Sequence, residues 1–91
     1  MKTFKNLEFE ADDMDGVAAW LLFDNNFGVS VVKGPYSYGG SKGLYELAVI
    51  YMSPDMNESK LHYDNEVANG NVVGNLTEEE VSELIEKVAN F

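Results

Sequence analysis

The sequence of 91 residues contains no cysteine and only six basic side chains. The absence of cysteine excludes a disulfide framework, a thiolate zinc site and a thiol nucleophile. Sixteen acidic side chains against six basic ones give a formal charge of −10, which leaves nothing to neutralise the phosphates of a nucleic acid. We therefore expect no direct nucleic-acid binding.

Long hydrophobic runs and linkers are also missing. The longest apolar stretch, residues 16–23, is far shorter than the roughly 20 residues that cross a bilayer. The basic start of the chain is not followed by the apolar segment of a secretory signal. We therefore expect a cytoplasmic protein that does not bind membranes. Because no Pro-, Gly- or Ser-rich run divides the chain, we also expect a single domain over residues 1–91.

The C-terminal segment carries the clearest local pattern, which predicts a helix over residues 78–90. Thr77 is placed to cap this helix, and Glu80 completes a capping box. Apolar residues then recur with helical spacing, at Val81, Leu84, Ile85, Val88 and Phe91. Such a one-sided apolar stripe needs a partner surface, and the strands that precede the helix are the candidates.

Those strands alternate with turns along the rest of the chain. Residues 44–52 (LYELAVIYM) give the strongest strand signal, because they are rich in β-branched and aromatic side chains. Further strands are expected over residues 7–10, 17–23, 29–32 and 61–63. The apolar run 17–23 is typical of a central strand covered on both faces, with a short helix from Asp13 as the alternative. The prediction is an α+β fold, an antiparallel β-sheet meander of about five strands with one C-terminal amphipathic α-helix packed on one face.

Motifs for catalysis and for metal binding are weak. The glycine-rich segment 34–43 has Lys and Ser in the wrong order for a phosphate-binding loop, and a strand follows it instead of a helix. Asp12, Asp13 and Asp15 resemble the start of a calcium loop, but the later ligand positions are apolar. His62, the only histidine, has no evident second ligand or base. We expect no enzymatic activity, no cofactor and no metal.

Exposed aromatic and acidic side chains are the candidate contacts with another protein. Tyr36 and Tyr38 offer amphipathic contact area on a glycine-rich frame, although a mobile connection between strands is the plainer interpretation. The acidic side chains either engage a basic surface or only keep the protein soluble. The candidate partner-binding residues are Tyr36, Tyr38, Lys42, Asp12, Asp13, Asp15, Glu79, Glu83 and Glu86.

Three segments carry a resemblance, residues 27–40 (FGVSVVKGPYSYGG), 43–49 (GLYELAV) and 73–81 (VGNLTEEEV). In these segments the chain resembles small uncharacterised acidic proteins encoded by tailed bacteriophages, whereas residues 1–26 add little. The resemblance implies a place in the cytoplasm of an infected bacterium. It also implies a role in binding and diverting host proteins, which include restriction and CRISPR effectors. No functional residue follows from it.

Three functions compete on these grounds. The first is a non-enzymatic accessory protein of a phage that binds and modulates a host or phage protein. The second is a nucleic-acid mimic that inhibits a DNA- or RNA-binding defence enzyme. The third, a small enzyme or metal-binding domain, requires a pocket with convergent acids. For the assembly we expect a monomer, or a homodimer through an edge strand at residues 61–63 or 7–9.

Overall fold

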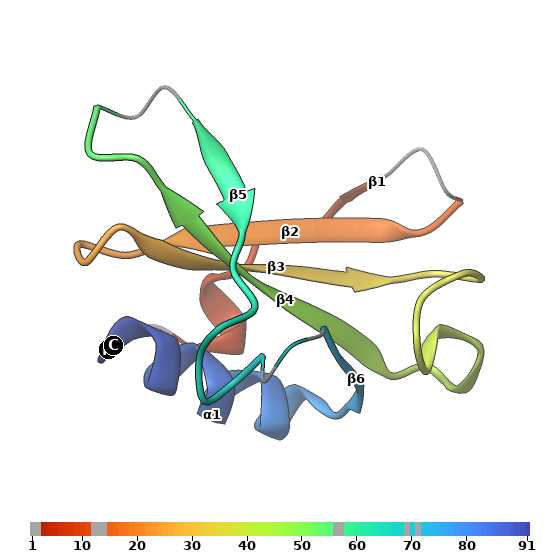
Figure 1. Cartoon of the computed structure of the whole chain (residues 1–91). Coiled ribbons are helices and arrows are strands. Elements are labelled where there is room, and N and C mark those ends of the chain that lie inside the picture. Colours follow the sequence, from red (N-terminus) through yellow and green to blue (C-terminus); the bar gives the residue numbers. More distant parts are fainter. Residues whose placement is uncertain (1–2, 12–14, 56–57, 69, 71) are drawn as a thin grey trace.

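The computed structural model describes residues 3–11, 15–55, 58–68, 70 and 72–91. Within these ranges an antiparallel β-sheet carries an α-helix on one face, which is the predicted α+β fold (Figure 1). The strands are β1 (Glu10–Ala11), β2 (Val17–Leu22), β3 (Phe27–Lys33), β4 (Tyr45–Met52), β5 (Ser59–Leu61) and β6 (Val73–Leu76). The helices are α1 (Glu78–Ala89) and two short 3-10 helices, η1 (Phe4–Asn6) and η2 (Gly40–Lys42).

The sheet follows the predicted meander for most of its width. Strands β1 to β5 lie in chain order, each antiparallel to the next. β6 departs from this order, because it returns to pair with β4. On its side away from β3, β4 therefore has two partners, with Leu61 of β5 opposite Ile50 and Leu76 of β6 opposite Tyr45.

Helix α1 is confirmed almost to the residue, and its capping box is present. The Glu80 N–H donates to the Thr77 hydroxyl (3.2 Å), and the Thr77 N–H donates to the Glu80 carboxylate (3.0 Å). The apolar stripe packs on the sheet, where Val81, Ile85 and Val88 are fully buried. No helix in the described ranges is long and apolar enough to cross a membrane.

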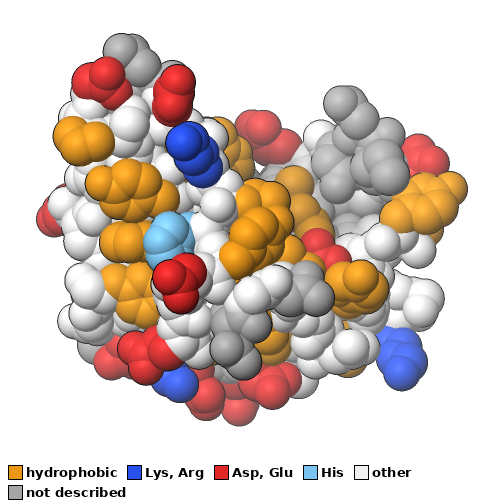
Figure 2. Space-filling view, in the orientation of Figure 1, with side chains coloured by type: hydrophobic (Ala, Val, Ile, Leu, Met, Phe, Trp, Pro, Cys, Tyr) orange, Lys and Arg blue, Asp and Glu red, His pale blue; other side chains and the backbone are white. Residues whose placement is uncertain are grey.

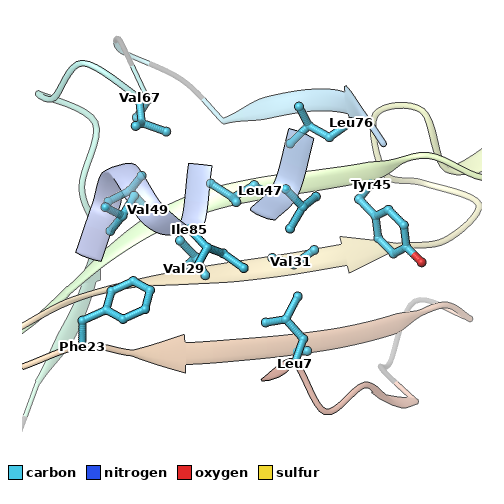
Figure 3. Close-up of a cluster of buried hydrophobic side chains, with 14 residues drawn as sticks. Leu7, Phe23, Val29, Val31, Tyr45, Leu47, Val49, Val67, Leu76 and Ile85 are labelled. Atoms are coloured by element: carbon cyan, nitrogen blue, oxygen red, sulfur yellow. The ribbon is translucent and has the colours of Figure 1, made fainter. Parts of the chain in front are cut away.

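Strand alternation decides which side chains meet α1. Val29 and Val31 of β3 and Leu47 and Val49 of β4 are at most 1% exposed, and all four belong to one cluster with Ile85 (Figure 3). Successive side chains of a strand point to opposite faces, so the residues between these four point away from α1. Helix α1 thus covers one face of the sheet and not the other.

Three strand predictions need correction. Residues 7–9 do not form a strand, although Leu7 is buried and Glu8 is exposed as the alternation required; pairing begins only at Glu10. The predicted strand 61–63 lies earlier, at Ser59–Leu61, because the turn after β4 brings Ser59 opposite Met52. β6 was missed, since glycine and asparagine at its centre are poor strand formers.

The apolar run after the acidic turn is a strand, β2, and the alternative of a helix is wrong for the described residues. Asp13, from which that helix would start, lies outside them. The expected burial on both faces is wrong as well, because the Trp20 side chain is 62% exposed. The reason is topological: β2 lies next to the border of the sheet, and α1 packs on the face opposite Trp20.

Candidate functional site

The connection between β3 and β4 carries the two exposed tyrosines and folds back on itself through short-range hydrogen bonds. The Ser37 hydroxyl accepts from the Gly34 N–H (2.9 Å) and donates to the Gly34 carbonyl (3.1 Å). The Leu44 N–H donates to the Gly39 carbonyl (2.9 Å). Gly39 (φ +89°) and Gly43 (φ +77°) adopt the left-handed conformation that favours glycine. The composition of the segment therefore determines its main-chain path.

This loop is also fixed to two strands. The Tyr38 N–H donates to the Glu46 carboxylate of β4 (3.0 Å), and the Asn75 N–H of β6 donates to the Tyr38 carbonyl (3.1 Å). Gly74 lies so close that a Cβ on it would collide with the Cβ of Tyr38. These contacts hold the Tyr38 main chain between β4 and β6. The loop is thus bonded to both strands at Tyr38.

The side chains of the loop point outward from this fixed main chain. Tyr36 is 72% exposed and Tyr38 is 58% exposed, and Lys42 in η2 is exposed as well. An aromatic ring on an ordered main chain loses little conformational freedom when a partner covers it. The loop is thus suited to contact a second molecule.

Two acidic positions lie at the same end of the sheet as this loop. Asp15 precedes Gly16, whose Cβ, if present, would lie 2.7 Å from the Cα of Gly34 at the start of the loop. Glu79 is exposed in the first turn of α1, which follows β6 directly, and Figure 1 shows the β3–β4 loop and the start of α1 on the same side of the molecule. We call this group the tyrosine end; its members are Tyr36, Tyr38, Lys42, Asp15 and Glu79.

The remaining candidate residues lie elsewhere. Glu83 and Glu86 are exposed further along α1, where they line a shallow depression of about 420 Å³ together with Glu66 and Lys87. Figure 2 shows acidic side chains gathered along the border formed by this helix, and others far from it. Asp12 and Asp13 lie outside the described residues, so the structure does not place their side chains.

The sequence interpretation missed an apolar surface on the face of the sheet that α1 does not cover. Trp20 is 62% exposed and Leu61 is 51% exposed. The register places Leu61 opposite Ile50, which is buried but lies outside the helix-side cluster. A signal was available: one predicted helix cannot cover two faces of a sheet, so some apolar strand residues had to remain open.

The acidic and imidazole side chains of the described residues do not gather into a metal site. No set of three or more acidic or imidazole side chains there is arranged to hold a metal ion. The His62 Nδ1 lies 3.0 Å from the Asn65 Nδ2, and its ring packs edge-on against Phe27 with centroids 5.1 Å apart. His62 is thus a packed and hydrogen-bonded side chain.

No protein-family model, curated protein or solved structure matches this chain. The bacteriophage origin stays a prediction from the sequence segments that carry it. On the surface itself, the tyrosine end combines a hydrogen-bonded main chain with exposed tyrosine side chains.

Proposed function

We propose that this protein is a non-enzymatic binding protein that recognises another protein through the tyrosine end. The observation that carries the proposal is the pairing of a fixed main chain with exposed rings at Tyr36 and Tyr38. Tyrosine is enriched where proteins meet, because its ring buries apolar area while its hydroxyl finds a polar partner. A preformed loop also lowers the entropy cost of association.

The charge of the protein indicates the chemistry of the partner. Asp15 and Glu79 lie at the same end of the sheet as the tyrosines, and the whole chain has a formal charge of −10. The net negative charge attracts a basic partner surface, and only six basic side chains oppose this attraction. Association is therefore fast at low salt and slower at high salt. We therefore propose a partner with Lys and Arg around an apolar contact.

The resemblance to bacteriophage proteins supplies a setting for this activity. It favours the cytoplasm of an infected bacterium as the place of action, and a host or phage protein as the partner. The proposed role is to bind that protein and change what it does.

Affinity capture from a bacterial lysate tests the proposal. The tagged protein is expected to recover one specific partner, identified by mass spectrometry, and the double variant Tyr36→Ala, Tyr38→Ala is expected to lose it. Tyr63→Ala is the matched control, because Tyr63 is a 40% exposed tyrosine outside the loop. Equal recovery with the double variant, or the same loss with Tyr63→Ala, would contradict a role for the tyrosine end.

A nucleic-acid mimic is the second candidate, favoured by one observation. Glu79, Glu83 and Glu86 are exposed and follow one another at helical spacing, so they form a row of carboxylates along α1. On this alternative, duplex DNA or RNA competes with the protein for its partner. Replacing the three glutamates by glutamine should weaken capture more than replacing Asp24, Glu58 and Asp64 by their amides, which removes the same charge elsewhere.

A further inference from the structure

The outer side of β2 is only partly paired. The Phe23 N–H donates to the Phe27 carbonyl (2.8 Å), which sets the alternation of hydrogen bonds between β2 and β3. In an antiparallel pair such bonds recur at every second residue, so Ala18, Trp20 and Leu22 direct their main-chain groups away from β3. β2 therefore presents three sets of main-chain donors and acceptors at its outer side.

Only the first of these sets is taken up by another strand. β1 pairs with β2 at Ala18 and Val17, and Figure 1 shows it beside one end of β2. Before Glu10 the chain leaves the sheet, because Leu7 is buried in the core. Within the described residues, no strand pairs with Trp20 or Leu22 on this side. Such an edge can accept an extended segment of another chain.

A hollow beside this edge adds a preference for positive charge. It measures about 280 Å³ and is lined by Glu8, Glu10, Ala11, Ala18, Ala19 and Trp20. Both glutamates are exposed, and the indole of Trp20 is 62% exposed. Carboxylates beside an open aromatic ring suit a Lys or Arg side chain, whose stem packs on the ring while its charge meets the acids.

No positive charge of the described strands competes for this position. The Lys33 ammonium lies 4.9 Å from the centre of the Tyr45 ring, which belongs to the cluster on the α1 side. Lys60 lies on β5, at the opposite border of the sheet. The residues that line the hollow thus include two carboxylates and no positive charge.

The same charge argues against a second copy of this chain as the occupant. Two β2 edges paired with each other would bring together two chains that each have a formal charge of −10, with the exposed carboxylates of Glu8 and Glu10 on each chain. The mutual repulsion of two such charges opposes their association. A segment of another protein with alternating basic residues has no such conflict.

We propose that the outer side of β2 at Trp20 and Leu22 binds an extended, basic segment of a partner protein as an added strand. The main chain of the segment pairs with these two residues. One of its Lys or Arg side chains enters the hollow and lies between Trp20 and the carboxylates of Glu8 and Glu10. This surface is separate from the tyrosine end, so each can fail without the other.

Fluorescence gives a direct test, because Trp20 is the only tryptophan in the chain. The probe is a blocked peptide, Thr-Lys-Thr-Lys-Thr-Lys, titrated into the full-length protein at low salt. We expect a saturable change in tryptophan emission that weakens at high salt. The same peptide with Glu in place of Lys should leave the emission unchanged, and so should the Lys peptide with alternate amides methylated, since it cannot pair as a strand.

Variants locate the effect. Glu8→Gln with Glu10→Gln should raise the apparent Kd of the peptide by about three- to tenfold, as expected for the loss of two exposed carboxylates. Glu83→Gln with Glu86→Gln removes the same charge from α1 and should change the Kd by less than about twofold. An equal effect of the two double variants on the Kd would overturn the proposal. It would show that the peptide responds only to the overall negative charge of the protein.

Two further results would also overturn it. One is an unchanged emission with the Lys peptide, or an equal response to the N-methylated peptide. The other is a dimer in light scattering that is lost in Leu22→Pro and buries Trp20, because that would assign the edge to a second copy. Circular dichroism of each variant confirms that the fold is retained before its binding is compared.

Discussion

Gly74 and Gly39 lie where the β3–β4 loop meets β6, and neither position has room for a side chain. A Cβ on Gly74 would collide with the Tyr38 Cβ, and one on Gly39 would lie 2.9 Å from the Cα of Asn75. The position of the exposed tyrosines thus depends on these two small residues. Substitution of these glycines should act on binding through the position of the loop.

Gly74→Ala tests this dependence at the scale of one residue. We expect the variant to lose about 1–3 kcal/mol in free energy of unfolding, because the added methyl group forces the loop away from β6. Urea denaturation measures the loss, and the amide chemical shift of Tyr38 reports the displacement. Ser41→Ala, an exposed change in the same loop, should stay within about 0.5 kcal/mol of the parent. An unchanged Tyr38 amide in Gly74→Ala would contradict the tight packing.

Hydrogen bonds hold both ends of α1. The bonds at its start are local, whereas the bond at its end joins residues far apart in the sequence. At its start, Thr77 and Glu80 cap each other over three residues. At its end, the Asn25 amide in the turn between β2 and β3 donates to the Val88 carbonyl (2.9 Å). The second contact couples the β2–β3 hairpin to the last turn of α1.

Asn25→Ala tests the contact at the end of the helix. We expect a loss of about 1–2 kcal/mol in free energy of unfolding, because the part-buried Val88 carbonyl loses its side-chain donor. Asp24→Ala, an exposed change in the same turn, is the control and should cost less than about 0.5 kcal/mol. Thermal or urea unfolding measures both, and equal losses would show that the turn itself is responsible.

The elements also show where sequence reasoning succeeds and where it stops. The capping box and the stripe from Val81 to Val88 are local patterns, so the helix was predicted almost to the residue. The return of β6 to β4 is a long-range pairing without a local signal. Likewise, the exposure of Trp20 depends on the strand order, which a run of apolar letters does not contain.

At the candidate site, the sequence predicts the exposure of the tyrosines but not the hydrogen bonds that hold the loop in place. The residue type and glycine-rich neighbours of Tyr36 and Tyr38 predict exposed side chains, and both are exposed. Their contacts with Glu46 and Asn75 join residues that are distant along the chain, so they become visible only in three dimensions. The placement of Asp15 near the loop follows from strand register in the same way.

At the scale of the whole molecule, the surplus of negative charge acts on every surface at once. A formal charge of −10 over 91 residues repels itself in the folded state more than in the expanded unfolded chain. Added salt screens this repulsion. The charge that would attract a basic partner therefore also lowers the stability of the free protein.

Salt should consequently stabilise the protein. We expect the Tm to rise by about 4–8 °C between low and high NaCl, which corresponds to about 1 kcal/mol for a domain of this size. In Glu58→Lys with Glu86→Lys, where each exchange adds two positive charges, the formal charge falls from −10 to −6 and the rise should be smaller. Calorimetry measures it, and a Tm that falls with salt would contradict the repulsion.

The hydrogen bond from Asn75 to Tyr38 ties the loop to the stretch that leads into α1. A partner that binds the loop also restrains the chain just before α1. Partner binding and local unfolding of this stretch are therefore thermodynamically linked. Amide protons in the first turn of α1 would then exchange with deuterium more slowly once the loop is covered. The start of the helix would therefore report on binding at the loop.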